Sequence, residues 1–135
     1  MASTKKTLKE AERRSPCPVA CTLDILGDRW TLLVIRDLVL GRSRFKDFTA
    51  SPEGIPTNIL SDRLERLQNH GIITQITPPD GSKHRAYQLT TKGESLRPIL
   101  AAMRDWGLTW EKGTKVLMQP PPTDTPKPKK QSRPA

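Results

Sequence analysis

The chain has 135 residues, of which 34% are hydrophobic, so a single domain with one modest core is the default expectation. Its formal charge of +9 favours an anionic partner, and no apolar run of about 18 residues is present to cross a membrane. The Lys-rich N-terminus has no apolar segment after it, so a secretory signal is excluded, and two cysteines do not make a disulfide scaffold; we therefore expect a cytoplasmic protein.

The positive charge is concentrated at the two ends of the chain. Residues 1–14 hold five Lys or Arg against two Glu, which gives +3, and residues 112–135 hold six against one Asp, which gives +5. Residues 15–111 hold twelve basic against eleven acidic groups, which gives only +1. We predict a flexible basic arm over residues 1–15 and a disordered Pro/Lys-rich tail over residues 113–135. Such ends add salt-sensitive attraction to phosphate. Evidence that the folded part binds DNA must therefore come from local clusters of Lys and Arg within it.

The domain between these ends, residues 16–112, is predicted to be mainly helical. A first helix spans about 18–26, with Pro18 in its first turn. Asp28 is the expected cap of a second helix over 30–40, which is apolar on most sides and should be the buried centre. A short third helix over 44–50 follows, with Ser43 as its candidate cap.

The next predicted helix, residues 56–70, carries the most informative pattern. Its apolar residues form one stripe, and Gly71 marks its C-terminal end. The remaining surface is polar, and residues near the N-terminus of a recognition helix go deepest into a major groove. Together with the short helix before it, this segment is predicted to be a helix-turn-helix. The candidates for base contacts are Thr57, Asn58, Ser61 and Arg63.

A β-hairpin is predicted directly after this helix. Residues 72–77 are β-rich, Asp80-Gly81 is typical of a tight turn, and residues 84–89 read as the return strand. A helix followed by a basic-tipped hairpin is the outline of a winged helix, with the wing over about 78–85. The plainer alternative is an ordinary solvated helix and hairpin. The candidates for phosphate contacts are Arg44, Lys46, Arg66, Lys83 and Arg85.

The last predicted helix starts near residue 91, where Thr91 and Glu94 have capping-box spacing. Pro98 should bend or restart it, because proline lacks a backbone donor. Its apolar stripe ends in two tryptophans, which is more than a small domain needs for its own core. We expect its far end to be a subunit interface, the alternative being a helix that only packs on the core. The candidates here are Met103, Trp106 and Trp110.

Several segments, in order and without large gaps over roughly residues 16–110, closely resemble the HxlR-type regulators, a branch of the MarR-like winged-helix family. The opening is Cys17-Pro18-Val19 followed by Thr22-Leu23-Asp24-Ile25-Leu26-Gly27-Asp28-Arg29-Trp30. The similarity continues through Gly54-Ile55-Pro56-Thr57-Asn58-Ile59-Leu60 and Arg63-Leu64-Glu65-Arg66-Leu67. It ends with Tyr87-Gln88-Leu89-Thr90-Thr91-Lys92-Gly93 and Trp106-Gly107.

The resemblance implies a bacterial, homodimeric DNA-binding transcription factor with a winged helix-turn-helix fold. In such proteins the first and last helices build the dimer, which adds Val19 and Leu23 to the interface candidates. The two recognition helices then read a near-palindromic operator on double-stranded DNA. The family often senses an aldehyde or oxidant through the cysteine before Pro-Val, which is Cys17 here. Cys21 and the long basic tail depart from the family pattern.

Cys17 is expected at the N-terminus of the first helix, where the positive helix end favours a reactive thiolate. It is therefore our redox-sensor candidate, with a small electrophile or oxidant as effector; the alternative is that both Cys17 and Cys21 are structural thiols. His70 precedes Gly71 at a helix C-terminus, where an imidazolium is mildly favoured. Neither cysteines nor histidines have the spacing of a zinc site, so no metal or cofactor is expected.

No Ser/His/Asp arrangement, phosphate loop or carboxylate pair stands out, so we predict that the chain is not an enzyme. We expect a sequence-specific transcriptional regulator, bound to the nucleoid when it occupies DNA. The alternative is a winged-helix protein-interaction module without DNA binding, which the acidic Asp62 and Glu65 on the 56–70 helix would suit.

Overall fold

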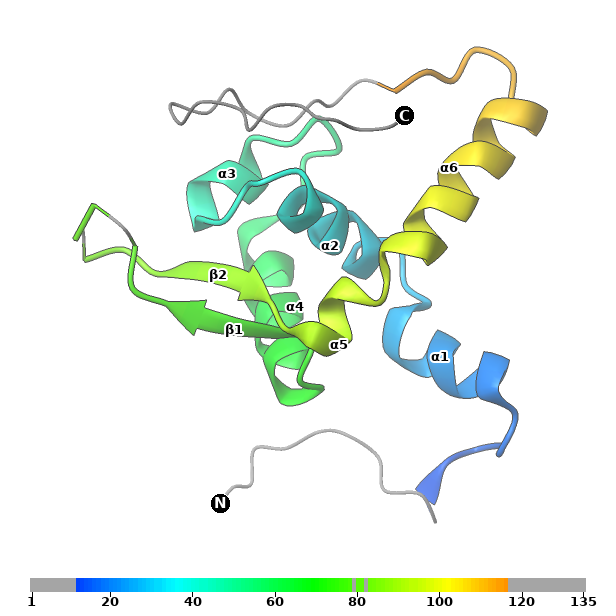
Figure 1. Cartoon of the computed structure of the whole chain (residues 1–135), viewed down its shortest axis with the longest axis horizontal. Helices are drawn as coiled ribbons and strands as arrows, with labels where there is room; N and C mark the ends of the chain where they lie inside the picture. The colour runs from blue at the N-terminus through cyan, green and yellow to red at the C-terminus, as the bar shows by residue number, and fades with distance from the viewer. Residues whose placement is uncertain (1–11, 79, 82, 117–135) are drawn as a thin grey trace, which may run out of the picture.

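The computed structural model describes residues 12–78, 80–81 and 83–116, so most of the predicted arm and tail lie outside the described residues. The fold is mainly helical with one two-stranded antiparallel hairpin, as predicted. In Figure 1, α2, α3 and α4 pack together, the hairpin extends to one side, and α1 and α6 lie on the other side. The elements are α1 (Pro18–Leu26), α2 (Thr31–Val39), α3 (Phe45–Thr49), α4 (Thr57–Asn69), β1 (Ile73–Ile76), β2 (Ala86–Leu89), α5 (Thr91–Glu94) and α6 (Arg97–Trp110).

The hydrophobic core forms where α2 meets α4 and the hairpin. Ile35 of α2 is fully buried, as expected for the helix that is apolar on most sides. Helix α4 contributes a buried stripe of Leu60, Leu64 and Leu67, spaced by four and three residues as one face of a helix requires. Phe48 of α3 is also buried against this core. The stripe therefore turns the other side of α4 outward.

The hairpin is short and is extended by one bridge. Strands β1 and β2 pair antiparallel from Ile73 opposite Leu89 to Ile76 opposite Ala86. Arg44, just before α3, forms an isolated bridge to Ala86, and the Tyr87 N–H donates to the Ser43 carbonyl at 2.9 Å. The base of the wing is thereby attached to the start of α3.

Two of the predicted helix caps differ from those observed. Asp28 does accept hydrogen bonds from the N–H groups of Trp30 and Thr31, at 3.0 and 3.2 Å, as expected. The prediction that Ser43 caps α3 is wrong: the Asp47 carboxylate accepts from the N–H groups of Ser43 and Arg44 instead. A carboxylate in the first turn can reach back to the free donors before the helix, and it does so here.

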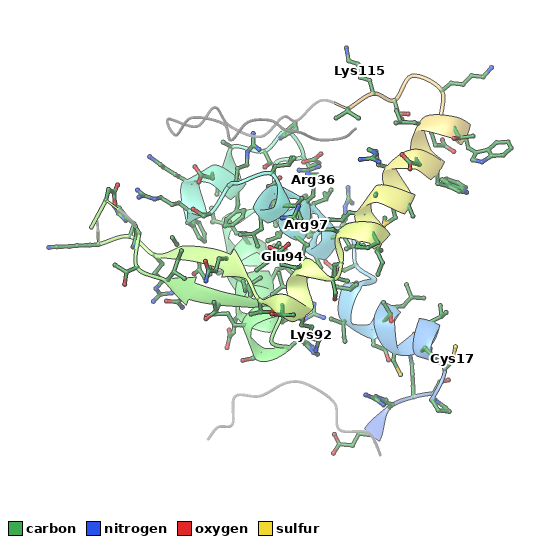
Figure 2. All side chains as sticks on the ribbon, in the orientation of Figure 1. Cys17, Arg36, Lys92, Glu94, Arg97 and Lys115 are labelled. Carbon is green, nitrogen blue, oxygen red and sulfur yellow. The ribbon has the colours of Figure 1, made fainter. Side chains whose placement is uncertain are left out.

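The second difference lies at the start of α5. Thr90, not Thr91, is the N-cap residue, and its hydroxyl accepts from the Gly93 N–H at 3.1 Å. The predicted restart at Pro98 is confirmed, because α5 ends at Glu94 and α6 begins at Arg97. Glu94 and Arg97 form an ion pair across this break, and Figure 2 shows them side by side.

The C-terminal end of α4 closes with the hydrogen bonds of a Schellman motif. Gly71 has φ +73°, which favours glycine, and its N–H donates to the Gln68 carbonyl at 2.9 Å. The Ile72 N–H donates to the Leu67 carbonyl, also at 2.9 Å. The chain thus turns directly from α4 into β1, which sets the hairpin beside the helix. Among the described residues, no helix is long and apolar enough to span a membrane.

Candidate nucleic-acid interface

The outer face of α4 presents three of the predicted base-contact residues to solvent. Thr57, Asn58 and Ser61 are exposed on its first two turns. Asp62 and Glu65 are exposed as well, so the same outward surface becomes acidic further along the helix. The N-terminal half of α4 therefore offers short hydrogen-bonding groups of the kind that contact base edges in a major groove.

Arg63 is not brought together with these three residues. Its Nε donates to the Asp28 carboxylate at 2.8 Å, and its Nη1 contacts the Asp62 carboxylate. The Arg63 side chain is 17% exposed. Although burial raises the pKa of Asp28, hydrogen bonds from Thr31, Arg63 and the Trp30 N–H lower it to about 2. The pair is thus fully ionised at neutral pH.

The predicted phosphate-contact residues lie at the start of α3, on α4 and at the wing. Lys46 is exposed on α3, and Lys83 and Arg85 are exposed at the wing. Arg66 is half-buried on α4 itself. Arg44 forms an ion pair with Asp80 at 2.8 Å, which joins the start of α3 to the tip of the wing.

An open groove of about 410 Å³ lies between α4 and the wing. Ser61 and Glu65 form part of its α4 wall, and His84 and Arg85 form part of its wing wall. The groove therefore brings a base-contact candidate and a phosphate-contact candidate into one concave surface, although they lie 24 positions apart in the sequence.

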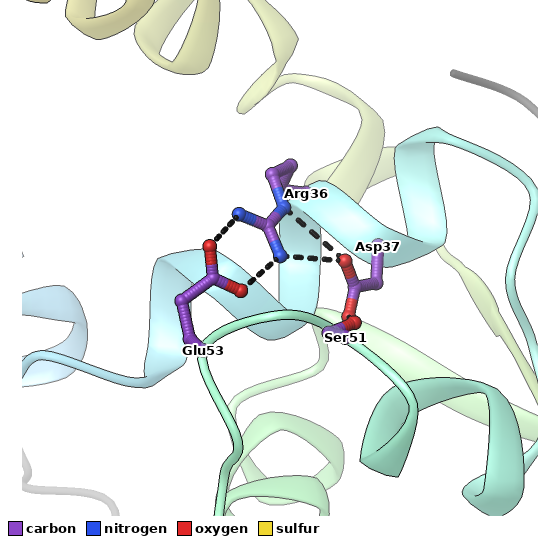
Figure 3. A network of polar contacts seen from close by, with 4 residues as sticks. All are labelled: Arg36, Asp37, Ser51 and Glu53. Atoms are coloured by element: carbon purple, nitrogen blue, oxygen red, sulfur yellow. Dashed lines mark hydrogen bonds and ion pairs between the residues drawn. The ribbon is translucent and has the colours of Figure 1, made fainter. Parts of the chain in front are cut away.

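A polar network fixes the segment that leads into α4 (Figure 3). The Arg36 guanidinium donates to both oxygens of Glu53, at 2.9 and 2.8 Å, and also to Asp37. The Ser51 hydroxyl donates to the other carboxylate oxygen of Asp37. The Asp37 residue is only 3% exposed. The hydrogen bonds from Arg36 lower the pKa of Glu53. Arg36 and Asp37 are charged residues on a helix that is otherwise apolar on most sides. Because buried charges need partners, their position was the sequence signal that could have pointed to this network.

A second set of contacts holds the C-terminal end of α4. The Thr90 hydroxyl donates to the Gly71 carbonyl at 2.6 Å, and Lys92 Nζ donates to the His70 carbonyl at 2.7 Å. Burial and the positive charges of Lys92 and Arg66 lower the pKa of His70. The expectation of a favoured imidazolium at His70 is therefore wrong, because burial of the ring and the neighbouring cations both disfavour its charged form. Figure 2 shows Lys92 on α5, beside the end of α4; sequence analysis gave it no role.

The two cysteines lie far from this surface. Cys17 is exposed at the N-cap of α1, and Figure 2 shows it on the side opposite the hairpin. Cys21 is partly buried, with its Sγ 3.2 Å from the Ser15 carbonyl oxygen. Arg14, which lies near Cys17 in sequence, forms an ion pair with Asp24 at 2.6 Å.

The predicted dimer residues lie on α1 and α6 and are all exposed. On α1 the one buried residue is Leu26, while Val19 is 66% and Leu23 is 54% exposed. Helix α6 has no buried residue in this single chain. Its exposed apolar residues include Met103, Trp106 and Trp110. An apolar surface of this kind is expected to be covered in the working protein.

Within the described part of the chain, no group of three or more His, Cys, Asp or Glu side chains is placed to hold a metal ion. The absence of a cofactor remains a prediction.

Comparison with known proteins gives consistent relatives. The family described as HxlR-like helix-turn-helix matches residues 25–115. The HTH-type transcriptional regulator sll1512 of Synechocystis is 34% identical over 94 residues, which cover 70% of each chain. The crystal structure of PA1607 is 37% identical and superposes with a TM-score of 0.70, over 83% of this chain and 84% of that one. The reduced transcriptional regulator YodB of Bacillus subtilis is 28% identical, with a TM-score of 0.60 over 75% of this chain and all of YodB. Two further YodB structures are also similar. The diamide-treated form has a TM-score of 0.55 over 70% of this chain and 94% of that one, and the quinone-bound form has a TM-score of 0.58 over 70% of this chain and all of that one.

Proposed function

The chain belongs to the HxlR-like helix-turn-helix family and is a transcriptional regulator, and from that premise we propose that it is a homodimer that reads a near-palindromic DNA operator. Helix α4 enters the major groove, and the wing over residues 78–85 contacts the adjacent backbone. The observation that carries the proposal is the exposed face of Thr57, Asn58 and Ser61. The buried leucine stripe orients this face outward, exposed basic residues lie on α3 and the wing, and Arg85 of the wing lines the same groove as Ser61.

The roles divide by chemistry. Asn58 can pair bidentately with adenine, and the hydroxyls of Thr57 and Ser61 can contact several bases. Lys46, Lys83 and the other basic candidates neutralise phosphates and therefore fix the register without reading sequence. Arg44 forms an ion pair with Asp80, so it must leave the Asp80 carboxylate in order to contact a phosphate.

Dimerisation is supported by the apolar surface that α1 and α6 leave exposed. Two copies that share this surface would place their α4 helices in successive major grooves, about 34–36 Å apart. The Trp106→Arg variant should therefore sediment as a monomer and lose operator binding. Leu108→Arg is the matched control, because Leu108 is 45% exposed but lies on the opposite side of α6. If Trp106→Arg remains dimeric, this interface is the wrong one.

We propose Cys17 as the site where an oxidant or small electrophile acts. It is exposed at the end of a proposed dimer helix, and the similar protein YodB has been solved both after diamide treatment and with a quinone bound. Diamide or an aldehyde should release the operator from the wild type but not from Cys17→Ser. Cys21→Ser, which alters the partly buried thiol, should respond like the wild type. Equal release from Cys17→Ser would contradict the role.

The test of DNA binding is selection of a site from random-sequence duplexes, followed by titration over a range of salt concentrations. A DNA-binding protein must lose affinity steeply as salt rises. Asn58→Ala should cost roughly 1–3 kcal/mol and relax the preference at one base pair. Lys83→Ala should weaken all sequences alike and reduce the salt slope by about one.

A protein-interaction module without DNA binding is the second candidate, and one observation favours it. Asp62 and Glu65 are exposed on the outer face of α4, where carboxylates repel phosphate. In that case no duplex would be selected, and binding to random DNA would come only from the basic ends of the chain. If DNA is bound, the chain acts in the bacterial cytoplasm at the nucleoid.

A further inference from the structure

Arg63 lies at the edge of the buried side of α4. It follows the buried Leu60 by three residues and precedes the buried Leu67 by four, so it is their neighbour on the helix surface. Asn58, Asp62 and Glu65 instead share the outer face. The Arg63 side chain is accordingly directed to the flank of α4 that faces the start of α2, where it meets Asp28.

Asp28 joins three parts of the molecule. It lies between α1, which ends at Leu26, and α2, which begins at Thr31. Its carboxylate accepts the N–H groups that begin α2, and the same Oδ2 oxygen accepts the Arg63 Nε at 2.8 Å. This contact spans 35 positions of the sequence and connects α4 to the α1–α2 junction.

The hydrogen bonds of Arg63 are directed to protein carboxylates. A guanidinium reads guanine by aligning two donors with O6 and N7 of the base, which requires the fork to be free. The Arg63 fork instead contacts Asp28 on one side and Asp62 on the other. Turning the guanidinium outward into a DNA major groove would break its contact with Asp28 and leave that half-buried carboxylate without its cation.

We propose that Arg63 is a positioning residue and Asp28 its anchor: their ion pair sets the orientation of α4 on α2 and so aims the base-reading residues. This inference rests on the proposed DNA-binding function. Because α1 ends two residues before Asp28, the pair also links the orientation of α4 to a proposed dimer helix. A change in how α1 packs is transmitted to α4 through this contact.

The test uses full-length dimeric protein with the selected operator and its complete set of single-base-pair variants. Asp28→Asn removes the charge but keeps an oxygen that can cap α2, since Asn caps helices as well as Asp. Arg63→Gln removes the other charge. We expect each variant to lose about tenfold in operator affinity, which corresponds to about 1.4 kcal/mol. The base-pair preferences should stay as in the wild type, and the double variant should lose no more than either single one.

Asp62→Asn is the matched control. It removes the neighbouring carboxylate of Arg63 but leaves the contact with Asp28, so operator affinity should stay at least as high as in the wild type. Stoichiometric titration with operator should show an unchanged active fraction in every variant. A variant that only destabilises the fold lowers the active fraction, whereas a misaligned helix raises Kd.

Three results would overturn the inference while leaving the proposed function intact. The first is a loss of preference at one base pair in Arg63→Gln, with Asp28→Asn unaffected. The second is additive losses in the double variant, and the third is a loss in Asp62→Asn as large as that in Arg63→Gln. Failure of the wild type to select any sequence overturns the proposed function and this inference with it.

Discussion

The structure leaves no room for a side chain at Gly93, and the cost of adding one can be worked out from the distances. This residue is buried in α5, where the chain passes the end of α4. A Cβ atom at Gly93 would lie 2.2 Å from the Ile72 carbonyl oxygen and 2.9 Å from Cδ2 of Leu89. The same Ile72 oxygen accepts hydrogen bonds from the N–H and hydroxyl of Thr90, at 3.0 and 3.1 Å. Gly93→Ala therefore disturbs the contact that joins α5 to the segment after α4.

The expected cost follows from the size of the overlap. Ordinary carbon contacts lie near 3.5–4 Å, so backbone must move by more than 1 Å, and overpacking of this kind costs about 1–3 kcal/mol. The higher helix propensity of alanine offsets at most about 1 kcal/mol of this cost. A net loss of about 2 kcal/mol corresponds to a fall in Tm on the order of 10 °C for a domain of this size.

Thermal unfolding followed by circular dichroism measures this effect. Thr91→Ala is the control, since Thr91 is exposed on the same short helix and its replacement should change the stability by less than about 0.5 kcal/mol. We also expect Gly93→Ala to weaken operator binding, because the end of α4 loses its support. A Tm for Gly93→Ala within about 2 °C of the Thr91→Ala value would contradict the close packing of α5 against the Ile72 carbonyl.

Three further predictions concern the contacts around α4. The pKa of His70 in the folded protein lies below its usual 6.5, so as the pH falls the unfolded chain binds this proton before the folded protein does. The free energy of unfolding should therefore decrease as the pH drops through 6.5. The His70→Asn variant should lack that part of the decrease. An unchanged pH dependence of Tm in this variant would exclude the contribution. Lys92→Met removes a nearby positive charge and should raise the pKa of His70 in an NMR titration, whereas a pKa equal to that of the wild type would mean that Lys92 does not act on it. Ser51→Ala leaves the buried Asp37 carboxylate without one donor and should lower the unfolding free energy in urea by about 1–3 kcal/mol; an unchanged midpoint would contradict this.

Features that depend on near neighbours in the chain were predictable from the sequence. The span of α1 over 18–26 and the glycine at the end of α4 were both predicted and are observed. The leucine stripe of α4 also pointed inward as its spacing predicted. Helix periodicity and capping involve residues at most five apart, so the sequence displays them directly.

Contacts between distant segments were not predictable in the same way. Ser43 and Thr91 were plausible caps, but the observed geometry favours Asp47 and Thr90. Lys92 reaches the end of α4 across 22 positions, and no local pattern marks that contact.

The sequence by itself determined the family, the order of the elements and the set of polar groups that α4 could present, because all of these follow from residue type and helical spacing. Only the tertiary structure decided which of those groups face outward. By residue type alone, Arg63 is as suitable for contacting bases as the exposed Thr57 and Asn58. The packing of α4 on α2 places it beside Asp28 instead, and the Coulomb attraction of that carboxylate holds it there. The pattern of a helix shows which residues share a face, but the neighbouring helix determines which face remains free.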